Sequence, residues 1–297
     1  MSIQQLFEAL KTGAEHPPPV DATPPAMRDW AEGVTRHTPL AQNVTITRAR
    51  FGPYQGDLVL PEGGDRSKLV VYYHGGGFFL FSPRTYRVTT THLARATNVA
   101  VFAPDYRQAP ENPAPAAHDD AFGAYQWVLK EGYAADRIAL AGDSAGGNLA
   151  LATVVRARAR NLPLPRALVL FSPWLDFAEE GASYRTTTDD PILPPQVLDG
   201  FKQAYLRDGY RKSPDVTPFY DDFGRLPPTL VHVGSWERLL DDSVTLVARM
   251  RNADVDAQLK IFDGMCHGWQ LFAPMLEEGM ASLEESAHFI KTHLMQS

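Results

Sequence analysis

The chain has 297 residues, with 28 Lys or Arg against 35 Asp or Glu, so its formal net charge is −7. This negative balance excludes a protein that acts mainly by neutralising nucleic-acid phosphates. With 44% hydrophobic and 21% charged residues, the chain can form a core and is not globally disordered. Its single cysteine, Cys266, excludes an intrachain disulfide and a cysteine-based zinc cage.

The first residues, MSIQQLFEALKTG, lack the basic and apolar regions of a signal peptide. No run approaches the roughly 18 apolar residues of a membrane-spanning helix. We therefore expect a cytoplasmic protein with no stable membrane insertion.

The N-terminal part of the chain is predicted to contain a short helix over Ile3–Lys11. The proline-rich stretch over 16–25 follows it and is predicted to be a non-helical linker, because each proline ring removes an N–H donor and restricts the residue before it. We interpret residues 1–44 as an N-terminal cap segment and residues 45–297 as a single α/β domain.

The remaining sequence alternates between strand and helix patterns. Thr45–Phe51 and Gln55–Leu60 alternate with period two, which predicts an antiparallel, half-exposed pair. Short apolar runs, typical of strands buried on both faces, occur at 69–73, 99–103, 138–141, 167–171, 229–233 and 258–262. Helical spacing of apolar residues occurs at 117–131, 145–159, 239–251 and 280–294. This alternation predicts an α/β fold with its active groups at the carboxyl ends of parallel strands.

One long segment, 177–226, interrupts this alternation. It is longer than a simple crossover between two strands, and its predicted helix, Gln196–Leu206, would lie outside the sheet. We interpret it as a lid that, with the N-terminal segment, covers the active edge of the sheet.

The pattern G-x-S-x-G occurs at Gly142-Asp143-Ser144-Ala145-Gly146, between an apolar run and a helical stretch. In that setting a strand turns abruptly into a helix, and the serine stands at the apex of a strained turn. Side chains at the two glycine positions would collide with neighbouring backbone. The start of the helix also directs N–H donors at negative charge that develops near the serine. The pattern predicts Ser144 as a nucleophile.

Three glycines, Gly75, Gly76 and Gly77, follow another apolar run directly. In acyl transfer, negative charge collects on the carbonyl oxygen of the tetrahedral transition state, and N–H groups aimed at that oxygen stabilise it. Glycine lets the backbone come close and adopt positive φ. We predict an oxyanion hole in this glycine loop, with Gly76 and Gly77 as donors and the N–H of Ala145 as the third.

A base must reach Ser144, and nine histidines are available. His267 follows the last predicted core strand and is placed over the carboxyl edge of the sheet, so we predict that it is the base. His232 lies inside a predicted strand and is expected to be buried with its hydrogen bonds satisfied. His74 is interpreted as a structural hydrogen-bonding group. Cys266, beside His267, lacks a glycine turn and is interpreted as packing.

The orienting carboxylate should come between the nucleophile and the base in this chain order. Glu237 lies in the loop just after the predicted strand 229–233, whereas Asp241 and Asp242 fall at the start of a helix, where carboxylates usually serve the helix dipole. We predict Glu237, with Asp241 as the alternative.

Several motifs together resemble those of the hormone-sensitive-lipase-like branch of the α/β-hydrolases, the bacterial family IV esterases. They are HGGGF at 74–78, DYRQAPE at 105–111 followed by PA at 115–116, GDSAGGNLA at 142–150, SPW at 172–174 and LPP at 226–228. The resemblance extends over about 45–290. It implies an eight-stranded sheet with a helical cap, and hydrolysis of short-acyl carboxylic esters. The usual D-x-L-x-D segment of that family begins here with Glu237, one methylene longer than Asp. We further expect an ion pair between Arg107 and Glu111.

Taken together, these features predict a serine carboxylesterase that needs no cofactor and no metal. Phe78, Phe79 and Leu80, with Phe81, are predicted to wall the acyl pocket. The expected partners are a small ester and water, with a homodimer through the edge strand near 258–262. Two alternatives remain open: an amidase or deacetylase with the same residues, and a non-catalytic ligand-binding protein on a hydrolase scaffold.

Overall fold

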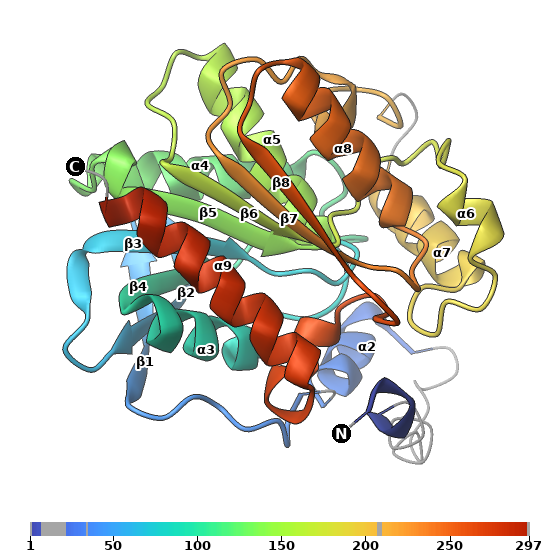
Figure 1. The fold of residues 1–297 in the computed structure, drawn as a ribbon, viewed down its shortest axis with the longest axis horizontal. Coiled ribbons are helices and arrows are strands. Elements are labelled where there is room, and N and C mark those ends of the chain that lie inside the picture. Colours follow the sequence, from blue (N-terminus) through green and yellow to red (C-terminus); the bar gives the residue numbers. More distant parts are fainter. Residues whose placement is uncertain (1, 7–21, 34, 207–209, 296–297) are drawn as a thin grey trace.

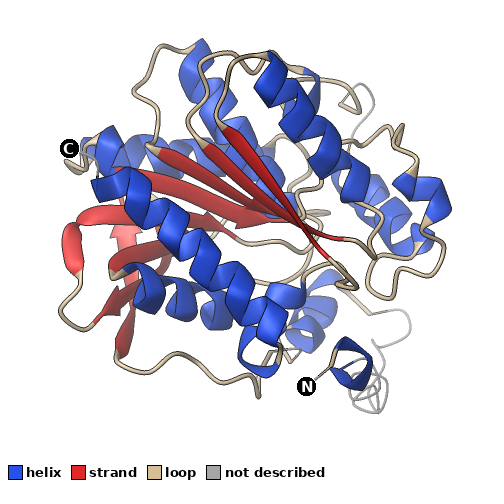
Figure 2. Cartoon of the chain, in the orientation of Figure 1, coloured by secondary structure: helices blue, strands red, loops and turns tan. Residues whose placement is uncertain are grey.

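A computed structural model describes residues 2–6, 22–33, 35–206 and 210–295. Its central layer is one eight-stranded sheet in the order β1-β2-β4-β3-β5-β6-β7-β8, covered by helices on both faces (Figure 2). The strands are β1 (Val44–Phe51), β2 (Tyr54–Pro61), β3 (Asp65–Tyr73), β4 (Val99–Pro104), β5 (Ile138–Asp143), β6 (Ala167–Phe171), β7 (Thr229–Gly234) and β8 (Ala257–Phe262). The predicted antiparallel pair is confirmed as β1 and β2, and all strands from β4 to β8 in this order run parallel.

The two faces of the sheet carry different helices (Figure 1). The helices are α2 (Pro24–Ala31), α3 (Arg87–Thr97), α4 (Ala116–Lys130), α5 (Ala145–Ala159), α6 (Ser183–Thr186), α7 (Pro195–Tyr205), α8 (Leu240–Asn252) and α9 (Glu277–Met295), with short 3₁₀ turns η1 (Ala135–Arg137), η2 (Pro218–Tyr220) and η3 (Trp269–Met275). Along β3, Val71 and Tyr73 pack with α4, α5 and α8, whereas Val70 and Tyr72 pack with α3 and α9. Because successive side chains of a strand point to opposite faces of the sheet, β3 contributes to two hydrophobic cores. No helix in the described ranges is both long and apolar enough to cross a bilayer.

Helices α3 and α2 depart from the sequence-based prediction. Helix α3 is missing from it, because its sequence, RVTTTHLARAT, is rich in β-branched threonine, which disfavours a helix. The threonine hydroxyls bond back to the helix itself; Thr91 Oγ1, for example, donates to the Arg87 carbonyl at 2.6 Å. Helix α2 begins at Pro24, inside the stretch predicted to be non-helical, since prolines at the first helical positions lose no hydrogen bond.

The N-terminal helix prediction falls partly outside the described residues. Residues 3–6 are helical, and residues 7–11 are not among those described.

The edge strand β8 is less buried than predicted. Gln258, Lys260 and Ile261 are exposed, and Leu259 is half-buried. The prediction of burial on both faces is therefore wrong for this strand, because β8 lies at the end of the sheet and, among the described residues, has a neighbouring strand, β7, on one side only.

The segment over 177–226, called the cap below, contains α6, α7 and η2 in its described part. In Figure 1, α6 and α7 lie beyond the arrowheads of the parallel strands, at the same edge as α2. Tyr205 anchors α7 to the sheet domain: its hydroxyl donates to His118 Nδ1 at 2.6 Å, and its carbonyl accepts from Ala114 N–H. His118 Nε2 in turn lies 2.9 Å from Asn148 Oδ1 of α5. This chain of contacts ties the cap to the helix that follows Ser144.

Candidate active site

Ser144 stands at the turn between β5 and α5 with φ 52° and ψ −121°, a conformation that non-glycine residues rarely adopt. The turn is held from both sides: Ser144 N–H donates to the Phe171 carbonyl at 2.9 Å, and Ser144 C=O accepts from Trp174 N–H at 3.0 Å. A Cβ at Gly142 would lie 2.3 Å from the Gly146 oxygen, and one at Gly146 would lie 2.0 Å from the Tyr73 oxygen. The two glycines are required because the backbone passes too closely for any side chain.

The glycine loop follows β3, which pairs directly with β5 through Tyr73 and Gly142. The order of the strands reverses here, and ligands of open α/β sheets bind at such switch points. Gly76 has φ 103° and Gly77 has φ 64°. Within the described residues, the N–H groups of Gly76 and Gly77 donate to no protein acceptor, so they are free to bind an oxyanion.

Gly75 does not fit the donor role predicted for the whole loop. Its N–H donates to Asp143 Oδ1 at 3.0 Å, and a donor engaged in this way is not available to a substrate. The candidate oxyanion donors that remain are Gly76, Gly77 and Ala145.

Asp143 occupies a variable position of the G-x-S-x-G pattern, and the sequence analysis gave it no role. In the structure its carboxylate contacts the glycine loop. Besides Gly75 N–H, its buried carboxylate accepts from Tyr72 OH at 2.9 Å and from Tyr86 OH at 2.6 Å. Burial raises the pKa of Asp143 to about 6, although the tyrosine hydroxyls work in the opposite direction. Asp143 joins the glycine loop to the turn that carries Ser144.

His267 follows β8, and Glu237 follows the neighbouring strand β7. His267 Nδ1 lies 3.2 Å from Glu237 Oε2, and the two side chains are 7% and 0% exposed. With its proton on Nδ1, neutral His267 keeps Nε2 unprotonated and able to accept a proton.

Burial alone would lower the pKa of His267. The hydrogen bond and charge of Glu237, with the charges of Asp190 and Asp143, raise it above its ordinary value instead. Burial raises the pKa of Glu237, and the contact with His267 opposes that rise. Asp143, the neighbour of Ser144 in the sequence, is among the charges that raise the pKa of His267.

The competing carboxylates point to the cap rather than to His267. Asp241 Oδ2 accepts from Ser183 N–H at 2.9 Å. Asp242 Oδ2 accepts from Leu175 N–H at 2.8 Å and from Asp176 N–H at 2.9 Å. These groups fix the chain where it enters the cap, so the contacts favour Glu237 as the orienting acid.

His74, His232 and Cys266 are buried and lie outside the His267–Glu237 pair. His74 Nδ1 donates to the Gly75 carbonyl at 2.8 Å, and burial lowers the pKa of His74 to about 4. His232 is buried as predicted, but its hydrogen bonds are not all satisfied: Nδ1 contacts Ser282 Oγ, while Nε2 has no partner among the described residues. Burial raises the pKa of the Cys266 thiol, which makes it a poor nucleophile.

The residues that were predicted to line the acyl pocket differ in how deeply the structure buries them. Phe78 is fully buried, and its ring stacks on Tyr205 of α7 with the centroids 4.1 Å apart, so it packs under the cap and leaves no exposed surface for a substrate. Phe79 is half-buried, and Leu80 is 9% exposed. Phe201 of α7 was not predicted: its ring lies over Gly77, where a Cβ would come within 2.3 Å of it. Sequence indicated that a cap helix exists, but not which of its residues faces the glycine loop.

The expected ion pair between Arg107 and Glu111 is wrong. Arg107 pairs with Asp120 of α4 at 2.8 Å, and Glu111 pairs with Arg28 of α2 at 2.6 Å. Arg28 lies 83 positions from Glu111 in the sequence. Both ion pairs form only when α2 and α4 pack against the loop after β4.

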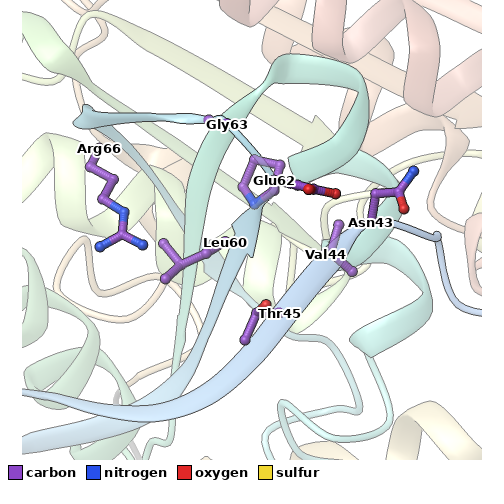
Figure 3. Close-up of a pocket in the computed structure, with 9 residues that line it drawn as sticks. Asn43, Val44, Thr45, Leu60, Glu62, Gly63 and Arg66 are labelled. Carbon is purple, nitrogen blue, oxygen red and sulfur yellow. The ribbon is translucent and has the colours of Figure 1, made fainter.

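A separate hollow lies away from these residues. It has a volume of about 560 Å³, and Asn43, Leu60, Glu62 and Arg66 are among the residues that line it (Figure 3). Because β2 runs antiparallel to β4, its end lies at the amino edge of the parallel strands, opposite to Ser144. The hollow is not part of the candidate active site.

The chain is similar to known proteins over most of its length. A family model described as the alpha/beta hydrolase fold matches residues 70–271. The chain is 35% identical to an esterase of Acinetobacter venetianus over 94% of this chain and 93% of that protein. It is 38% identical to an acetyl-hydrolase of Streptomyces hygroscopicus over 76% of each. A solved esterase from the bacterial hormone-sensitive lipase family is similar with TM-score 0.92 and 36% identity, covering 98% of this chain and 97% of that one.

The eight-stranded sheet, the serine turn and the glycine loop define an α/β-hydrolase. Within that class, the chain belongs to the bacterial hormone-sensitive lipase family of esterases. The family resemblance and the fold expected from the motifs are thereby confirmed.

Proposed function

We propose that this protein is a serine carboxylesterase that hydrolyses short-acyl carboxylic esters through an acyl-enzyme on Ser144. The observation that carries the proposal is the convergence of three features at one edge of the sheet. They are a serine at a strained turn, a neighbouring loop with unpaired glycine N–H groups, and a buried histidine–carboxylate pair. Similar proteins are also named esterases.

The proposed reaction uses these groups in turn. His267 Nε2 takes the Ser144 proton as Oγ attacks the ester carbonyl, and the oxyanion is held by the N–H groups of Gly76, Gly77 and Ala145. The imidazolium, stabilised by Glu237, gives its proton to the departing alcohol. Water then attacks the acyl-enzyme with His267 again as the base, which releases the carboxylic acid and restores Ser144.

The packing of the cap supports a preference for substrates with short acyl chains. The Phe201 ring lies over Gly77, and the Phe79 and Phe201 ring centroids are 6.3 Å apart, so aromatic side chains close this side of the site. We expect p-nitrophenyl esters from acetate to hexanoate to be hydrolysed with higher kcat/KM than long-chain esters. Phe201→Ala should extend the accepted chain length. A chain-length series that peaks at palmitate for the wild type would contradict this proposal.

The same residues could cleave an amide, and the name acetyl-hydrolase of one relative does not distinguish ester from amide. Matched ester and anilide substrates on the wild-type protein separate the two. A higher kcat/KM for the anilide would move the proposal to an amidase.

The edge strand supports a further proposal, a homodimer through β8. No strand in the described part of the chain pairs with the outer side of β8, and its Ile261 is 46% exposed, which favours pairing with a second copy. We expect sedimentation at micromolar concentration to show a dimer and Ile261→Glu to yield a monomer. Val244→Glu, at a residue of α8 that is 38% exposed, serves as the control and should leave the dimer intact. A monomeric wild type would refute the dimer.

A cytoplasmic location and the division into an N-terminal cap segment, 1–44, and a hydrolase domain, 45–297, stay predictions. The single, buried Cys266 is compatible with a reducing compartment.

A further inference from the structure

Arg28, on α2, connects the N-terminal segment to two loops at the carboxyl edge of the sheet. Its Nε donates to the Phe79 carbonyl at 2.9 Å, and its Nη2 donates to the Ala109 carbonyl at 2.6 Å. Phe79 belongs to the segment that continues the glycine loop after β3, and Ala109 to the loop after β4. One guanidinium therefore holds the backbone of both loops.

The orientation of this guanidinium is also fixed by the Glu111 carboxylate and by the Phe79 ring. Nη1 and Nη2 of Arg28 bond both carboxylate oxygens of Glu111, at 3.0 Å and 2.6 Å. The Phe79 ring lies below, with its centroid 5.5 Å from the guanidinium carbon. A bidentate carboxylate and an aromatic face orient arginine in a way that lysine cannot reproduce.

The other carbonyls of the segment 78–81 are held by the loop after β4. Ala109 N–H donates to the Phe78 carbonyl at 2.9 Å, and Gln108 Nε2 donates to the Leu80 and Phe81 carbonyls at 2.9 Å and 3.0 Å. The Phe79 carbonyl, by contrast, accepts its hydrogen bond from Arg28 of α2. Arg28 thus completes a set of contacts along the segment.

This segment is directly continuous with the oxyanion donors. Phe79 and Leu80 N–H both donate to the Gly76 carbonyl, at 3.0 Å and 2.8 Å, so the backbone folds back tightly on Gly76. Phe78 and Phe81 have φ 60° and 68°, values that L-residues adopt only when their surroundings hold them there. A shift of the Phe79 peptide would therefore turn the peptides that present the Gly76 and Gly77 N–H groups.

We propose that Arg28 is a positioning residue for the oxyanion hole, which keeps the Gly76 and Gly77 N–H groups aimed at the substrate carbonyl by fixing the Phe79 carbonyl. The inference rests on the proposed esterase function. Arg28 itself contacts no reacting atom. It acts through the backbone, and so its loss weakens binding of the transition state more than binding of the substrate.

The test compares Arg28→Met and Arg28→Lys with Arg36→Met, which removes an exposed arginine of the same N-terminal segment. Active sites are titrated with a fluorophosphonate, so that kcat refers to folded enzyme. We expect Arg28→Met to lower kcat about 10- to 100-fold with nearly unchanged KM, less than the loss of a whole oxyanion donor. The Ki of a trifluoromethyl ketone, whose hemiketal oxyanion occupies the hole, should rise by the same factor.

Arg28→Lys should recover only part of the loss, because an ammonium cannot hold two carbonyls and a carboxylate in one plane. If Arg28→Met is insoluble, Arg28→Lys provides the same kcat and Ki comparison. Effects on KM or thermal stability alone, or Arg28 variants that match Arg36→Met in kcat and in ketone Ki, overturn the inference. If the wild type and Arg36→Met are themselves inactive and unlabelled, the proposed function has failed rather than the role of Arg28.

Discussion

We expect Ser144→Ala to lower kcat for p-nitrophenyl acetate about a millionfold, because nucleophile, base and acid act as one unit. The remaining hydroxyl-free site still holds the oxyanion donors and the His267–Glu237 pair, so a small residual rate over water should persist. Since Ser144 is 6% exposed and its Oγ makes no structural hydrogen bond among the described residues, the variant should fold as the wild type does.

A matched control for this variant is Ser67→Ala. Ser67 lies near the amino end of β3, where it bonds Asp65, at the edge of the sheet opposite to Ser144. It should keep wild-type turnover. If Ser144→Ala stayed within about tenfold of the wild type, the hydrolysis would be using another nucleophile.

Glu237→Gln is expected to lower kcat by roughly 10⁴-fold, the loss found when the acid of other serine triads is made neutral. The amide can no longer stabilise the His267 imidazolium, and its NH₂ group can face Nδ1, which selects the wrong tautomer. Asp241→Asn is the comparison variant: its carboxylate bonds Ser183 N–H in the cap, so it should affect cap stability far more than kcat. The opposite ranking of these two variants would transfer the acid role to Asp241.

The pH profile adds an independent readout for the same variant. His267 must be neutral to accept a proton, so activity should be lost as the pH falls through its pKa. Because that pKa is raised, the midpoint of the loss should lie above the ordinary histidine value of about 6.5. In Glu237→Gln the raising charge is gone, so the acid limb of kcat/KM should move to lower pH. This shift separates His267 from Asp143, because the pKa of Asp143, about 6, is set mainly by burial and by the hydroxyls of Tyr86 and Tyr72. A wild-type rate that stays flat down to about pH 4 would exclude His267 as the base.

Local sequence signals were sufficient for the sheet and for the two loops with strict spacing. The turn at Ser144 and the loop at Gly76 could be placed because each combines a buried strand with glycines that the backbone geometry demands. The order of chain segments then indicated His267 and Glu237 as base and acid, and the two side chains are in contact. These inferences depend on short-range geometry, which a sequence encodes directly.

What sequence could not provide are the contacts made when distant helices pack. The partner of Glu111 is Arg28, 83 positions away, and nothing in the local pattern distinguishes it from Arg107. The burial of Phe78 under Tyr205 and the closeness of Phe201 to Gly77 likewise depend on where the cap settles. Helix α3 was missed because its threonines are poor helix formers in isolation and are stabilised by burial in the tertiary structure.

The most direct test of the account is covalent labelling of the wild-type protein with a fluorophosphonate, read by intact mass and peptide mapping. One adduct per chain on Ser144, formed at a rate that follows the protonation of His267 and abolished in His267→Ala, is the result expected from an activated serine facing an oxyanion hole. An unlabelled protein, or an adduct on any other residue, would contradict it.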